Sequence, residues 1–102
     1  MYCQNVISLD TTRFLTVDEF DRITRVRAKR ERCGYVEAAL LTAWDYMADL
    51  SSTDLSTREL LTKAYKVCMG AIVAKWEADE DKWYQGVKTI MNKFGEWGYR
   101  HE

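Results

Sequence analysis

The sequence predicts an all-α protein, a small helical bundle of three to four helices with a packed N-terminal arm. Apolar residues recur at spacings of three and four along most of the chain, which is the period of an amphipathic helix. Two Ser/Thr-x-x-Glu sequences, each ahead of such a pattern, have the form of helix-capping boxes. The 102 residues, 47% of them hydrophobic, are enough for a single helical domain with its own core.

The N-terminal arm, residues 1–15, is the least regular part of the sequence. Apolar residues flank a polar Asp-Thr-Thr sequence within it, which fits either a short β-hairpin or an extended segment. Their apolar character predicts that the arm packs on the helical body. The first helix is expected over residues 16–34, with Thr16 and Glu19 as its capping box and Gly34 as its left-handed end.

The second helix is predicted over residues 35–50, where the apolar pattern is unusually broad. Its inner stripe, with spacings of four, three, four and three, consists of Val36, Leu40, Ala43, Met47 and Leu50. The stripe is widened by Leu41, Trp44 and Ala48. The positions left for water are mainly Thr42, Asp45 and Asp49. A helix this apolar is covered on two sides, so it is either the central helix of the domain or part of an oligomer interface. Because this helix and the stretch over residues 60–76 are both broadly apolar, we expect a homodimer.

The third helix is predicted over residues 56–77. Ser56 and Glu59 form the second capping box at its start. Gly70 falls near the outward side of this helix. A glycine there costs about 1 kcal/mol relative to alanine unless another group packs close to it.

The fourth helix is predicted over residues 79–97, with Gly95 and Gly98 as its end. The acidic residues 77–81 before it are either a loop or its first turn, where carboxylates suit the helix dipole. One long bent helix, formed by joining the third and fourth, is the alternative, because the apolar stripe keeps its seven-residue interval across the acidic segment.

Several sequence features favour a cytoplasmic protein. Its compartment could be the cytoplasm of an infected host cell. Residues 1–9 lack the basic start and long apolar run of a signal peptide. No apolar run is long enough to cross a bilayer. The three cysteines include no Cys-x-x-Cys pair and fit small core residues in a reducing compartment, with a Cys3–Cys33 disulfide as the less favoured alternative.

Sequence signals for catalysis or metal binding are weak. The only histidine is His101, next to the C-terminus, and no Ser-His-Asp, Cys-His or His-x-x-x-His arrangement can be placed on one rigid element. The carboxylates of residues 77–81 lack the spacing and central glycine of an EF-hand. We therefore expect no enzyme activity, no bound metal and no cofactor.

Positive charge is concentrated in residues 22–32 of a chain whose net charge is −1. The six basic residues in this stretch are Arg22, Arg25, Arg27, Lys29, Arg30 and Arg32. One stripe of the predicted helix holds Arg22, Arg25, Lys29 and Arg32. Asp18 and Asp21 lie one turn before Arg22 and Arg25 and are expected to pair with them, as on many solvated helix faces.

The other two arginines are harder to explain. Phe20 and Ile23 begin a core-facing stripe, but Arg27 and Arg30 occupy the next positions of that stripe. Three explanations are open: the last two turns project beyond the core, the arginines fill a seam against the acidic helix ends, or a partner covers them. These cations would suit phosphates or an acidic protein patch.

These features favour a non-enzymatic macromolecule-binding protein, a protein-binding inhibitor or adaptor that acts through the basic helix. Phages and mobile elements often encode small inhibitors and anti-defence proteins of this kind. This expectation rests on what such proteins have in common and not on particular residues of this chain. The alternative is a small DNA- or RNA-binding regulator that uses the Arg22–Arg32 helix. A ligand sensor is a third class, but it requires a pocket that the sequence does not reveal.

Overall fold

The computed structural model describes residues 15–51 and 54–100, and its four helices confirm the all-α fold. They are α2 (Val17–Glu31), α3 (Tyr35–Leu50), α4 (Thr57–Ala78) and α5 (Glu80–Arg100). The predicted arm packing and hairpin fall on residues 1–14, which lie outside the described residues. Both capping boxes are present, one at Thr16 and one at Ser56.

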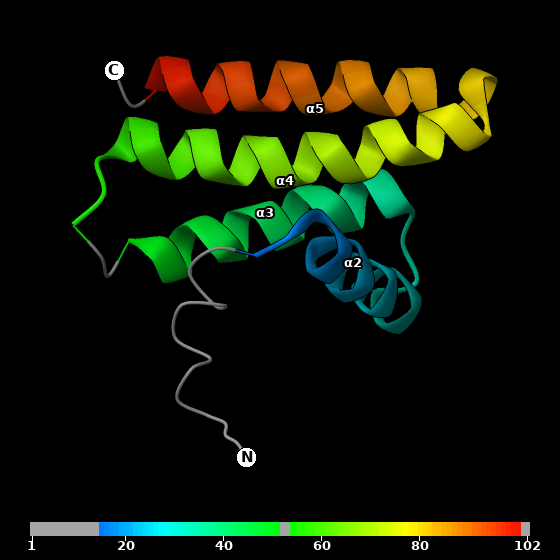
Figure 1. Ribbon diagram of the computed structural model, residues 1–102, viewed down its shortest axis with the longest axis horizontal. Helices are drawn as coiled ribbons and strands as arrows, with labels where there is room; N and C mark the ends of the chain where they lie inside the picture. The colour runs from blue at the N-terminus through cyan, green and yellow to red at the C-terminus, as the bar shows by residue number, and fades with distance from the viewer. Residues whose placement is uncertain (1–14, 52–53, 101–102) are drawn as a thin grey trace.

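Three of the helices lie lengthwise side by side, and the fourth crosses them. In Figure 1, α3, α4 and α5 run along the long axis with alternating direction, whereas α2 is seen nearly end-on. Helix α2 packs on both α3 and α4, and α5 packs mainly on α4. Helix α3 also contacts α5, so it meets all three other helices.

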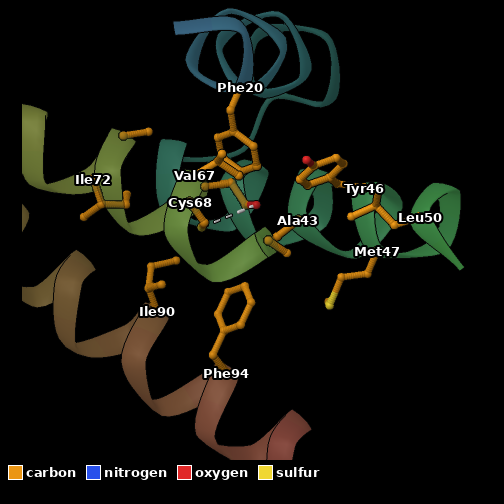
Figure 2. Packing of buried hydrophobic residues seen from close by; sticks show 13 residues of the cluster. Phe20, Ala43, Tyr46, Met47, Leu50, Val67, Cys68, Ile72, Ile90 and Phe94 are labelled. Carbon is orange, nitrogen blue, oxygen red and sulfur yellow. Dashed lines mark hydrogen bonds between the residues drawn. The ribbon is translucent and has the colours of Figure 1, made fainter. Parts of the chain in front are cut away.

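The core lies between α2 on one side and α5 on the other. Figure 2 shows Phe20 reaching in from α2 and Ile90 and Phe94 reaching in from α5, with Val67 and Cys68 of α4 between them. Phe20, Cys68 and Ile90 are completely buried. Because apolar side chains from all four helices meet here, removal of this surface from water is the main force that holds the helices together.

Two glycines allow close helix packing. A Cβ atom on Gly70 would lie 2.8 Å from a methyl carbon of Val17, and one on Gly86 would lie 2.9 Å from a methyl carbon of Val36. The presence of a glycine at position 70, despite its cost to helix stability, is thus explained. The first turn of α2 occupies the space that a side chain at this position would need.

The first helix ends differently from the prediction. Arg32, with φ 54°, is the left-handed residue, while Gly34 has an extended backbone (φ −72°, ψ 165°) and is the N-cap of α3. The reversal at Arg32 lets the N–H of Cys33 donate to the carbonyl of Ala28 at 3.1 Å. The chain therefore turns two residues earlier than the glycine.

The last two helices are separate, so the single bent helix is wrong. Asp79 breaks the helical backbone (φ −153°, ψ 81°). The acidic segment is divided: its first part ends α4, and its last part is the first turn of α5. Helix α5 also continues through Gly95 and Gly98 to residue 100, because a glycine weakens a helix without removing its backbone hydrogen bonds.

The faces of α3 correct a further expectation. Thr42, predicted to face water, is 3% exposed, whereas Leu41 and Trp44 are 38% and 52% exposed. The helix is turned so that Ala38, Thr42 and Tyr46 face the interior. No helix among the described residues is long and apolar enough to cross a membrane.

Candidate macromolecule-binding surface on helix α2

The buried face of α2 follows a different stripe from the predicted one. Phe20 and Thr24 are completely buried, and the side chain of Arg27 is 17% exposed. Ile23, placed in the core by the sequence, is 39% exposed, and the Arg30 side chain is 66% exposed. The helix is rotated so that Thr24 replaces Ile23 in the core, which turns Arg30 toward water.

Arg27 fills a seam between α2 and α3, as in the second of the three explanations, but its partner Asp45 lies within α3 and not at a helix end. Its guanidinium forms a short hydrogen-bonded ion pair with Asp45 of α3 and lies 3.6 Å from a carboxylate oxygen of Glu31. Its Nε is buried and has no hydrogen-bond partner among the described residues. Arg27 is therefore held within the fold.

On the opposite flank of α2, Asp21 is the centre of a polar cluster. Its carboxylate accepts a hydrogen bond from the Tyr35 hydroxyl, lies 2.9 Å from Nε of Arg25 and 3.4 Å from Nζ of Lys75. Burial raises the pKa of Asp21, but the Tyr35 hydrogen bond and the charges of Lys75 and Arg25 outweigh this effect and lower it. The predicted Asp21–Arg25 pair is confirmed, whereas Asp18 and Arg22 form no ion pair within the described part of the chain.

The outer side of α2 carries what we term the basic face. It consists of Arg22, Arg25, Val26, Lys29 and Arg30, all of which are exposed. Arg22 and Lys29 form no ion pair with any described residue, and Arg30 has only a 3.5 Å contact with Glu31. Arg32, the last of the predicted residues, is exposed directly beyond the helix end.

Val26 is the member of this surface that the sequence interpretation missed. It is 58% exposed, and Arg22 and Arg30 lie one turn before and after it on the same side of the helix. The sequence does contain the information that places Val26 on the outer side. A helical wheel drawn with Thr24 in the core puts Val26 on the opposite face. A threonine, however, is a weak marker of a core position.

Two features of the described residues bear on metal binding and on nucleophilic chemistry at cysteine. Within residues 15–51 and 54–100, no group of three or more His, Cys, Asp and Glu side chains is placed to hold a metal ion. Cys68 is buried, its thiol donates to the Ala39 carbonyl at 3.9 Å, and burial raises its pKa to about 12. A thiol held protonated in this way is a poor nucleophile.

No protein-family model matches this sequence, and no match is found among curated proteins or among solved structures.

Proposed function

We propose that this chain is a non-enzymatic binding protein that recognises an acidic surface of another protein through the basic face of α2. The observation that carries the proposal is the exposure of Val26, 58%, at the centre of a cationic helix face. An inhibitor or adaptor would act in this way, and the phage or mobile-element class stays part of the proposal.

A protein partner is favoured over a phosphate backbone because the basic face has an apolar centre. Protein interfaces combine a desolvated apolar core with a polar rim, and arginine is enriched in them. On this face Val26 would be the apolar core, and Arg22, Lys29 and Arg30 would be the rim. Phosphate contacts need the cations but gain little from the valine.

The test is capture of the partner by the full-length chain from nuclease-treated extracts of the source organism. We expect the Lys29→Glu, Arg30→Glu double change to weaken capture at least tenfold, because each reversal places like charges together. Val26→Gln, which keeps every charge, is expected to weaken capture about tenfold through lost apolar burial.

The matched control is Lys88→Glu with Lys93→Glu, two exposed lysines of α5 that make the same change in net charge. This control should capture the partner as the unchanged chain does. Capture that requires nucleic acid, or that survives the Lys29→Glu, Arg30→Glu change, would contradict the proposal.

Nucleic-acid binding is the alternative, and it is favoured by the number of cations on one short helix. Four basic side chains of the basic face, with Arg32, would give a salt slope of up to about −4.5 on duplex DNA. In a mobility-shift assay with mixed DNA and RNA, we then expect binding that Val26→Gln leaves unchanged. Absence of any shift at about 50 mM salt excludes this alternative.

A further inference from the structure

A second surface, which shares no residue with the basic face of α2, lies between the first turns of α4 and the last turns of α5. It is a groove of about 940 Å³, and its lining includes the apolar side chains of Leu61, Tyr65, Met91 and Phe94. Met91 is 53% exposed. We name this surface the α4–α5 groove.

A smaller apolar pocket of about 260 Å³ adjoins the groove. Leu61 and Thr57 line both of them, and the pocket is flanked by Trp44 and Trp97. The two indole rings lie 5.3 Å apart between centroids, and Trp97 in turn lies 4.7 Å from Phe94. Groove and pocket therefore have one connected aromatic lining, which suits an apolar side chain anchored at one end.

The two glycines near the end of α5 belong to this groove. Gly95 and Gly98 line it, and a Cβ atom on either would meet nothing within 4 Å. Unlike Gly70 and Gly86, they are not required for packing inside the described chain. They weaken α5 but leave its surface bare, which allows another backbone to approach closely.

The charged side chains that line the groove indicate which kind of ligand it favours. Arg58 and Lys66 line it, no Asp or Glu is among the described residues that do, and neither cation forms an ion pair with a described residue. The groove extends along α4 from Thr57 to Lys66, which corresponds to about 14 Å, or two and a half helical turns. This length is that of a short helix laid along the groove.

We propose that the α4–α5 groove binds an amphipathic helix of a partner protein that carries apolar residues on one face and carboxylates beside them. One apolar side chain of that helix enters the smaller pocket, whose lining includes Trp44 and Trp97. Its carboxylates lie against Arg58 and Lys66, and its backbone lies close to Gly95 and Gly98.

Two labelled synthetic peptides of about 15 residues, with the same leucine stripe and either Glu or Lys at the other positions, test this assignment. Fluorescence anisotropy with the full-length chain should show the Glu peptide binding at least tenfold more tightly than the Lys peptide. Gly95→Leu should weaken binding of the Glu peptide at least tenfold while the thermal unfolding midpoint stays equal or rises, because leucine favours the helix and fills only the groove.

A charge variant and a matched control complete the experiment. Arg58→Glu with Lys66→Glu should also lower affinity for the Glu peptide about tenfold, whereas Thr89→Leu, at an exposed position of α5 outside the groove, should leave it unchanged. Equal affinity for both peptides, or unchanged binding by Gly95→Leu, would overturn the proposal. So would self-association of the chain alone that Gly95→Leu abolishes, since a second copy would then be the occupant.

Discussion

Asp21 shows how one side chain links a helix to two others. Its carboxylate joins α2 to Tyr35 at the start of α3 and to Lys75 near the end of α4. The same pairing acts on Tyr35, whose pKa is raised by burial and by the hydrogen bond to Asp21, so that the hydroxyl remains a donor. Asp21 therefore stabilises the fold only while it is ionised.

We predict that Asp21→Asn lowers the free energy of unfolding by about 1–2 kcal/mol near neutral pH, because charge-assisted hydrogen bonds are lost. The folded-state pKa of Asp21 is lowered below its ordinary value of 3.8, so its contribution is complete above about pH 4 and is lost as pH falls through the folded-state pKa. Urea unfolding of both proteins at about pH 7 and about pH 3 should show the difference shrinking in acid.

Glu96→Gln is the control for this prediction. Glu96 forms an exposed pair with Lys93 at 3.8 Å, and its loss should change stability by only a few tenths of a kcal/mol. A stability difference for Asp21→Asn that is equally large in acid would mean that its effect does not depend on the charge.

Of the polar contacts of Asp21, one could be predicted from the sequence and two could not. The Asp21–Arg25 pair was predictable because positions four apart in one helix are neighbours. The contacts with Tyr35 and Lys75 were not, because they join different helices whose relative placement the local pattern does not contain.

At the scale of the element, helix starts were more predictable than helix ends. Thr16 and Ser56 each accept the amide of the residue three positions later, and both capping boxes are complete. These bonds form within four residues, so the sequence alone specifies them. The end of α2 depends on where the chain must turn to enter α3, and that turn falls on Arg32 instead of Gly34.

The left-handed backbone of Arg32 leads to a prediction about stability. Arg32→Gly should be more stable than Arg32→Ala by about 1 kcal/mol, because only glycine adopts φ near 54° without strain from a Cβ atom. Both changes remove the same charge, so the comparison in urea or thermal unfolding isolates the backbone. If the two variants are equally stable, the left-handed conformation at this position carries no cost.

At the scale of the whole molecule, α2 is attached to the other helices through one large apolar side chain and several smaller contacts. Phe20 is the only large apolar residue of α2 that is completely buried, and its ring is packed against the core in Figure 2. The other attachments are Val17 packed on Gly70, the buried Thr24, the Arg27–Asp45 pair and the cluster around Asp21. The position of the basic face therefore depends on Phe20.

We predict that Phe20→Ala lowers the free energy of unfolding by about 3–5 kcal/mol, through lost burial and the cavity left behind. Hydrogen exchange should show protection lost first in Val17–Glu31, while the centre of α4 stays protected. Met91→Ala, at an exposed position, is the control and should change stability by less than about 0.5 kcal/mol. Uniform loss of protection in all helices would show that α2 does not open separately.

The sequence by itself determined the all-α class, both capped helix starts and the concentration of charge in residues 22–32. These features depend on periodicity and on contacts within one or two turns. Tertiary structure decided the rotation of α2, which turns Arg27 into the seam and Val26 outward, and the groove beside Gly95. The local sequence pattern determines which side of a helix is apolar. The neighbouring helices that pack against that side determine which residues at its borders are buried.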